Sequence, residues 1–138
     1  MAYETHKAHY CYVTAGNRAG TAAKILQSLK EAGVNLLGFS GFPTKRGKAQ
    51  FDLVADKIAP IQKLAKKEDW KLSKPKQGFL VQGIDEVGAV AQPMAVLAEA
   101  GVNVTAASAV VSGDGRFGMV LWVKKKDYNR AAKVLSAK

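Results

Sequence analysis

The pattern of apolar and polar residues changes period several times along the first half of the chain. From Ala8 to Thr14 most residues are aromatic or β-branched, which is typical of a strand. From Gly20 to Ala32 the apolar residues recur on one side every three or four positions, which predicts an amphipathic helix that ends at Gly33. The predicted elements are, in order, a strand at 8–14, a helix at 20–32, a hairpin of strands at 34–42 and 48–55, a short helix at 58–64 and an edge strand at 69–73.

The second half of the chain repeats this β-α-β-β-α-β order but stops one strand short. Its predicted elements are a strand at 79–84, a helix at 88–100, strands at 102–112 and 117–124, and a helix at 127–136. Because Pro93 has no backbone N–H to donate, we expect the helix that contains it to begin near Ala89 or Val90. An unpaired strand edge is a liability, so we expect either residues 1–7 or a partner subunit to cover the open edge.

The two halves are also similar in sequence when the chain is shifted by 68 residues. Ala32–Asn35 recurs as Ala100–Asn103, and the same register gives 12 identities over the 47 positions from Tyr10 to Asp56. Self-similarity of this kind indicates two copies of one supersecondary unit. We therefore expect repeats at residues 8–74 and 78–138, separated by the segment Lys74-Pro75-Lys76-Gln77.

Composition and charge narrow the class of protein. The 138 residues are 48% hydrophobic, which is enough for a folded core, and they carry 21 Lys and Arg against 11 Asp and Glu, a net charge of +10. The two halves contribute +5 each, so the charge is spread rather than gathered in a basic tail. The single cysteine, the polar N-terminal residues and the lack of a long apolar run predict a cytoplasmic protein without a membrane span.

Residues that could carry catalysis do not form a convincing site. The segment Gly113–Gly118 matches G-x-G-x-x-G, but a β-type run follows it, so we interpret it as a hairpin with a primed turn at Asp114-Gly115. His6, His9 and Cys11 are close in sequence, yet no third group is placed to orient an imidazole. No cluster of Cys, His or carboxylate ligands is visible, so we expect no metal, no cofactor and no enzymatic activity.

The candidate binding residues lie at the two ends of the first helix of each repeat. A polar, glycine-containing loop precedes the helix, and an asparagine follows it; these residues are Asn17, Arg18, Ala19, Gly20 and Asn35, then Asp85, Glu86, Val87, Gly88 and Asn103. A helix N-terminus favours a carboxylate, and side-chain oxygens accept from an ammonium, so this combination suits the zwitterion of a free amino acid. The alternative is that Asn17 and Asp85 only cap the helices and that Asn35 and Asn103 only satisfy the backbone.

The arrangement resembles the ACT domain, whose unit has an Asp/Asn-x-Pro-Gly loop before the first helix and a Gly-Val/Ile-Asn sequence after it. The similarity covers roughly residues 9–136, and the whole chain looks like the small bacterial proteins made only of two ACT repeats. It implies a ferredoxin-like α+β sandwich of two βαββαβ repeats, the second without its last strand. It also implies one half-site at Asn17, Gly20 and Asn35 and another at Asp85, Gly88 and Asn103. The family proline is replaced by Ala19 and Val87.

The functional expectation is a non-enzymatic, allosteric amino-acid sensor. It would bind its ligand at interfaces between ACT units, associate as a homodimer and act in trans on a separate enzyme, transporter or regulator. One alternative is nucleic-acid binding, which is favoured by the basic residues Lys45, Arg46, Lys48, Lys124, Lys125 and Lys126. Tyr10, Tyr12, Phe39 and Phe51, however, lack the Gly-Phe signature of RNA-binding sheets. Another alternative is a scaffold that docks a protein and binds no metabolite.

Overall fold

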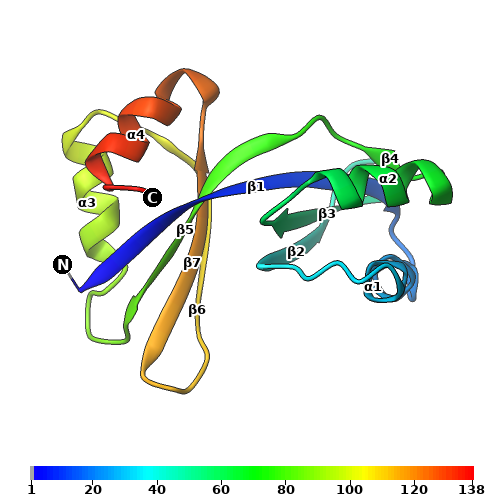
Figure 1. The fold of residues 1–138 in the computed structure, drawn as a ribbon, viewed down its shortest axis with the longest axis horizontal. Helices are drawn as coiled ribbons and strands as arrows, with labels where there is room; N and C mark the ends of the chain where they lie inside the picture. The colour runs from blue at the N-terminus through cyan, green and yellow to red at the C-terminus, as the bar shows by residue number, and fades with distance from the viewer. Residues whose placement is uncertain (1) are drawn as a thin grey trace. The chain divides into compact units, whose positions relative to one another are not determined.

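A computed structural model describes residues 2–138 and divides the chain into two compact units (Figure 1). The first-repeat unit is His9–Lys76. The second-repeat unit combines Gln77–Lys138 with the N-terminal segment that ends at Ala8. Among the described residues, no helix is long and apolar enough to cross a membrane. Each unit has its own hydrophobic core.

The first-repeat unit is a four-stranded antiparallel sheet with two helices. Its strand order is β2-β3-β1-β4, and Val13 of β1 lies opposite both Phe51 of β3 and Leu72 of β4. The core packs Ile25 and Leu29 of α1 against buried residues of β1 and β3. The elements are β1(Tyr3–Gly16), α1(Thr21–Glu31), β2(Gly38–Pro43), β3(Lys48–Ala55), α2(Ala59–Glu68) and β4(Lys71–Leu72).

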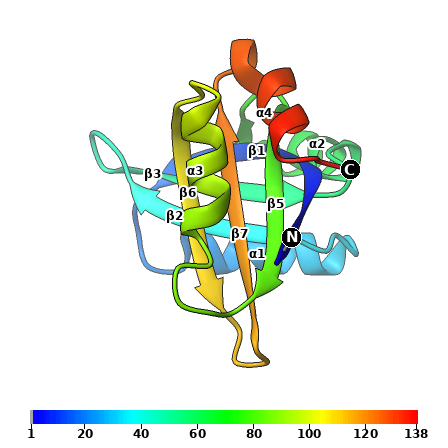
Figure 2. The ribbon, with the colours of Figure 1, turned by 90° about the vertical axis from the view of Figure 1, so that its left-hand side faces the viewer.

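The second-repeat unit has the same strand order, with the first half of β1 in the place of the fourth strand. The order is β1-β5-β7-β6, and α3 and α4 cover one face of the sheet (Figure 2). In its core, the rings of Phe79 and Tyr128 stack with centroids 4.8 Å apart. The elements are β5(Lys76–Ile84), α3(Ala91–Glu99), β6(Val104–Val111), β7(Arg116–Val123), the 3-10 turn η1(Lys125–Asp127) and α4(Tyr128–Val134).

The N-terminal strand therefore covers the edge that the second repeat leaves open. Tyr3 is 6% exposed and Thr5 is 1% exposed. The Ile84 N–H donates to the Ala2 carbonyl at 3.1 Å, so the start of the chain lies beside β5. On the other side of the strand, the Lys138 N–H donates to the Thr5 carbonyl at 3.0 Å. Of the two alternatives predicted for this edge, the chain uses its own N-terminus; Met1 lies outside the described residues.

Equivalent hydrogen bonds and glycines explain why the repeat is visible in the sequence. The Val34 N–H donates to the Leu29 carbonyl at the end of α1, and the Val102 N–H donates to the Leu97 carbonyl at the end of α3, both at 2.9 Å. Three identical glycine pairs have positive φ in both copies; they are Gly20 and Gly88, Gly33 and Gly101, and Gly47 and Gly115. A residue with a Cβ is strained at positive φ, so the backbone explains these three identities.

Most predicted elements are confirmed, but β1 runs from Tyr3 to Gly16 rather than over 8–14, and several further details differ. We expected the second strand to begin at Val34, but β2 begins at Gly38, because the pairing with β3 begins there. Asn17 and Asp85 do not cap the helices: neither α1 nor α3 has a side-chain cap, and their N-cap residues are Gly20 and Val90. The β6–β7 loop is not a two-residue primed turn, because its positive φ values fall at Gly113 and Gly115 rather than at Asp114.

Candidate functional site

The loop between β1 and α1 is exposed and is tied to a hairpin of the same unit. Residues 17–20 are all exposed, and the Asn17 N–H donates to the Gly47 carbonyl at 2.8 Å. The Thr21 N–H donates to the Arg18 carbonyl at 3.2 Å, which closes the turn into the helix. With φ at 91°, Gly20 makes a left-handed turn directly before the helix. The Asn17 side chain is left free of a capping role.

The loop between β5 and α3 has the same backbone construction. The Asp85 N–H donates to the Gly115 carbonyl at 2.9 Å, and the Ala89 N–H donates to the Glu86 carbonyl at 3.0 Å. These bonds are the equivalents, 68 residues later, of the two bonds in the first loop. Residues 85–88 are exposed, with Val87 fully so. The two repeats therefore hold their predicted binding loops in one shape.

The loop and the neighbouring hairpin carry opposite net charges in the two repeats. The loop and hairpin of the first repeat carry four cations and no acid, and the same positions of the second repeat carry three acids and one cation. In the first repeat the four cations are Arg18, Lys45, Arg46 and Lys48. In the second repeat the same positions hold Glu86, Gly113, Asp114 and Arg116, and Asp85 replaces Asn17. A hydrogen bond from the Ser112 hydroxyl lowers the pKa of Asp114, which keeps this carboxyl ionised. The loop and hairpin of the first repeat therefore attract anions, and those of the second repeat attract cations.

The structure separates each loop from the asparagine of its own repeat. Asn35 follows α1, whose 11 residues put the two ends of the helix about 16 Å apart. Asn103 follows α3, whose nine residues give a separation of about 13 Å. A free amino acid is shorter than either helix. Asn17 with Gly20 and Asn35 therefore do not contact one ligand within a unit, and the same is true of the loop at Asp85–Gly88 and Asn103.

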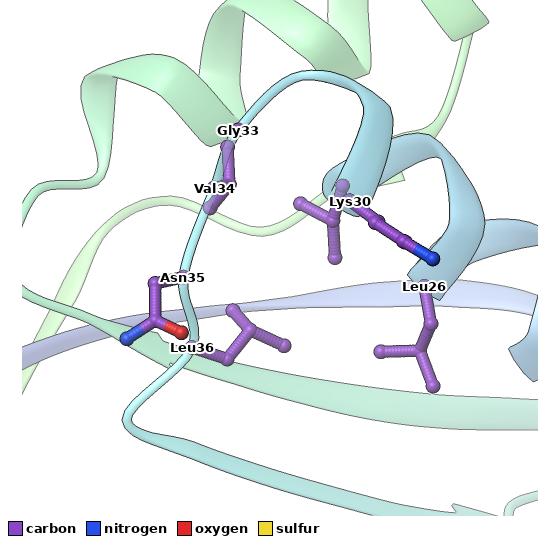
Figure 3. Close-up of a pocket in the computed structure, with 7 residues that line it drawn as sticks. Leu26, Lys30, Gly33, Val34, Asn35 and Leu36 are labelled. Carbon is purple, nitrogen blue, oxygen red and sulfur yellow. The ribbon is translucent and has the colours of Figure 1, made fainter.

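Two surface hollows involve predicted residues. One, of about 510 Å³, lies at the end of α1, where Asn35 sits at its border and directs its amide away from Leu26 and Lys30 (Figure 3). The other, of about 320 Å³, lies between the loop at Asp85–Gly88 and the end of β6. Its polar rim is formed by Asp85 and Glu86, and its apolar lining includes Val90, Val110, Val111 and Phe117.

The other candidate reactive groups are either buried or too far apart to act together. The Cys11 side chain is fully buried, and burial raises the pKa of its thiol to about 11, so the thiol is protonated and is a weak nucleophile at neutral pH. His9 is exposed. Among residues 2–138, no three His, Cys, Asp or Glu side chains come together in a way that could hold a metal ion.

The aromatic residues that could stack bases are partly buried and partly exposed. Phe39 stacks on Phe51 with ring centroids 6.2 Å apart, and Phe51 belongs to the core that packs against α1 and α2. Tyr10 is 8% exposed. Phe39 and Phe42 are 41% and 42% exposed, but both lie on the edge strand β2. RNA-binding sheets of this topology expose their aromatic residues on adjacent central strands, so this arrangement weighs against the nucleic-acid alternative.

One polar group that the sequence did not single out is Asp52 on β3. Its side chain is 3% exposed, and it accepts hydrogen bonds from the Ser40 hydroxyl at 3.0 Å and from the Gln50 amide at 2.9 Å. The apolar run Phe51–Ala55 gave no signal that a carboxylate within it would be satisfied by neighbouring strands. This residue stabilises the sheet rather than a site, because both of its donors come from β2 and β3.

Comparison with known proteins identifies the fold. No family model matches the sequence, and no curated protein matches it. A protein from Bacteroides thetaiotaomicron is similar in structure, with a TM-score of 0.75 and 14% identity over 99% of this chain and 90% of the other. The ligand-free regulatory subunit of aspartate kinase from Thermus thermophilus is also similar, with a TM-score of 0.68 and 13% identity over 99% of this chain and 95% of that subunit.

The same fold also occurs inside a much longer enzyme. Aspartate kinase from Synechocystis matches with a TM-score of 0.65 and 14% identity over 97% of this chain but only 25% of the kinase. Identities this low establish the architecture rather than a shared activity. Together with the two units and their repeated loops, they show that the chain has a ferredoxin-like, α+β fold built from two tandem repeats, as in the regulatory subunit of aspartate kinase.

Proposed function

We propose that this protein is a non-enzymatic, amino-acid-binding regulator that acts in trans on a partner protein. The observation that carries the proposal is the pair of exposed loops at 17–20 and 85–88, which share one hydrogen-bonding pattern at the start of a helix. Free N–H groups at a helix start and nearby side-chain oxygens are the groups that a zwitterion needs. The likeness to regulatory subunits of aspartate kinase supports a regulatory role for the fold.

The separation of loop and asparagine indicates how a complete site would be assembled. When two equivalent helices lie antiparallel, the N-terminal end of each is beside the C-terminal end of the other. The loop at Asp85–Gly88 of one copy would then meet Asn103 of a second copy, and a ligand would contact both. Binding would stabilise the associated state by no more than the ligand's differential affinity for it. This coupling is what would transmit the amino-acid signal to the partner.

The opposite charges of the two loops support a different ligand group at each loop. Arg18 supplies a cation for the carboxylate of a ligand bound at the first loop. Asp85 and Glu86 supply anions for an ammonium group bound at the second loop. The two half-sites therefore need not take the same amino acid, and a basic amino acid fits the second better than an acidic one.

Thermal denaturation against each of the twenty amino acids tests this proposal. A ligand at 100 times its dissociation constant adds about 2.7 kcal/mol to the free energy of unfolding, which raises Tm by several degrees in a chain of this length. The matched variants are Asn35→Ala and Asn103→Ala, which lie at equivalent exposed positions of the two repeats. We expect a shift with one or a few amino acids, and we expect one of the two variants to lose it.

Derivatives of the active amino acid then test the charge assignment. At the second loop, an amino-acid amide retains the ammonium and should still bind, whereas the N-acetyl derivative should not. At the first loop the preference should be reversed. If no amino acid shifts Tm, the sensor proposal fails, and the fold serves as a protein-docking scaffold.

A further inference from the structure

The first-repeat unit has an open groove between helix α2 and the edge strand β4. The hollow there has a volume of about 470 Å³, and it is lined by the second half of α2, by β4 and by the residues that follow β4. Trp70 and Leu72, which are half-buried, and Ala65, which is buried, form the apolar part of the lining. Among the described strands, β4 pairs only with β1, so its other edge is open beside this groove.

The outer edge of β4 has main-chain groups that can pair with a further strand. The Ser73 N–H donates to the Tyr12 carbonyl of β1 at 2.8 Å. Because bonded and non-bonded residues alternate along an antiparallel pair, the N–H and C=O of the preceding residue, Leu72, point away from β1. The Ser73 hydroxyl then accepts from the Tyr12 N–H at 2.9 Å and donates to the Lys74 carbonyl at 3.0 Å, which ends the strand. The edge can therefore hold one residue of an extended peptide.

The second-repeat unit shows how a segment occupies the corresponding edge. There the N-terminal strand has the place of β4, and the last residue of the chain lies against its outer side. The Lys138 N–H donates to the Thr5 carbonyl at 3.0 Å, and the Lys7 N–H donates to the Lys138 carbonyl at 2.9 Å. The neighbouring Ala137 packs against the core of that unit. One residue with two main-chain bonds and an apolar neighbour thus fills this edge in the second repeat, whereas no described segment fills it in the first.

The surroundings of the groove are strongly basic. Residues 57–76 contain seven lysines and two acids, so this short stretch carries +5 of the net charge of +10. Lys66 and Lys74 line the hollow and are exposed, and Asp69 is the one carboxylate among the described residues of the lining. The excess of lysines outweighs the partial negative charge at the C-terminal end of α2. The groove is therefore complementary to an acidic occupant.

We propose that the groove between α2 and β4 binds an extended acidic segment of the partner protein, which places one apolar side chain beside Trp70. The segment adds to the edge of β4 through the main-chain groups of Leu72, as peptides do when they extend a sheet. Its Asp and Glu side chains pair with Lys66 and Lys74 on the two sides of the apolar residue. This inference rests on the proposed action in trans, since it gives the surface that the partner contacts, but it requires no amino-acid ligand.

Selection of peptides from a random display library on the full-length protein, without amino acid, tests this inference. We expect the enriched peptides to carry several Asp and Glu residues around one aliphatic or aromatic residue. Fluorescence anisotropy with a synthetic copy of the most enriched peptide then gives its dissociation constant. Lys66→Glu and Lys74→Glu should each raise this constant by about tenfold. The matched control is Lys63→Glu, which makes the same change in net charge at an exposed position of α2 outside the hollow, and it should have little effect.

Two further measurements separate strand addition from charge attraction alone. In a Trp122→Phe background Trp70 is the one remaining tryptophan, and its fluorescence should shift to shorter wavelength when the peptide binds. N-methylation of each peptide residue in turn should weaken binding by about tenfold at the position whose N–H pairs with β4 and should have little effect at the flanking positions.

Several outcomes would overturn the proposal. It fails if no acidic peptide is enriched, if Lys63→Glu weakens binding as much as Lys66→Glu, or if peptide binding leaves the Trp70 fluorescence unchanged. It also fails if a single-stranded oligonucleotide binds more tightly than the peptide and depends on the same two lysines, because the groove is then a nucleic-acid site. None of these results alters the thermal shift with an amino acid, so the proposed function and this inference can fail separately.

Discussion

Tyr3 offers the sharpest test of the claim that the N-terminal strand completes the second repeat. Its side chain is 6% exposed and belongs to the core of that unit, together with Phe79 and Leu97. Its hydroxyl is buried without a hydrogen-bond partner among the described residues, and burial raises its pKa. Tyr3→Ala removes the ring, whereas Tyr3→Phe removes only the hydroxyl, so the two variants separate packing from polarity.

The expected magnitudes follow from this burial. Removing a buried aromatic ring costs about 3 to 5 kcal/mol, and we expect about 3 kcal/mol for Tyr3→Ala because part of the native contribution is offset by the unsatisfied hydroxyl. Tyr3→Phe removes that unsatisfied group and should be neutral or stabilising by about 1 kcal/mol. With a urea m-value of about 2 kcal/mol/M, Tyr3→Ala lowers the unfolding midpoint by about 1.5 M.

Hydrogen exchange shows which strands the Tyr3→Ala substitution destabilises. In Tyr3→Ala the amides of β5 and β7 should lose protection, while those of β3 in the first-repeat unit should keep theirs. Glu4→Ala is the control, because Glu4 is the exposed neighbour of Tyr3 and makes only surface ion pairs. A Tyr3→Ala variant as stable as Glu4→Ala, with β5 amides still protected, would refute the assignment of the N-terminal strand to this sheet.

Three further predictions follow from buried ionisable groups and from positive φ angles. Because burial raises the pKa of Cys11 to about 11, native protein should react with a thiol reagent only as fast as it unfolds; immediate reaction would contradict its burial. Burial, and secondarily a nearby carboxylate, raises the pKa of Tyr10 from 10.0 to about 12. The resulting stability is complete below pH 10 and is lost as pH rises towards 12, which urea unfolding across that range would show. Gly20→Ala and Gly88→Ala should each lower the free energy of unfolding by about 1 to 2 kcal/mol in the same assay, because φ is positive at both. Gly118→Ala should leave it unchanged. Equal effects at all three glycines would contradict this explanation.

The sequence predicted the architecture because the repeat encodes backbone geometry. The glycines at 20, 33 and 47 recur 68 residues later, and all six have positive φ, so the positions that shape the turns are those that match. Pro93 predicted the late start of α3, which begins at Ala91 with Val90 as its N-cap. The strand at Lys48–Ala55 has the predicted bounds.

The parts that the sequence did not predict depend on contacts between distant segments. Residues 3–7 are polar in composition, but the alternation of buried Tyr3 and Thr5 matters only once β5 lies beside them. The two half-sites remain a prediction: the sequence places each loop and its asparagine at opposite ends of one helix, and it does not show what a second copy would contribute. The opposite charges of the two loop ends become informative only when the hairpin at Gly47 is seen to bind the loop at Asn17.

An amide-resolved NMR titration with the amino acid that gives the largest thermal shift tests the central claim most directly. The account predicts that the perturbed amides group at both ends of one first helix, for the second repeat at residues 85–91 and at Asn103. Asn103→Ala should abolish the perturbation at the loop as well, because the ligand spans a loop from one copy and an asparagine from another. Perturbations confined to other surfaces, or none at saturating amino acid, would contradict the account.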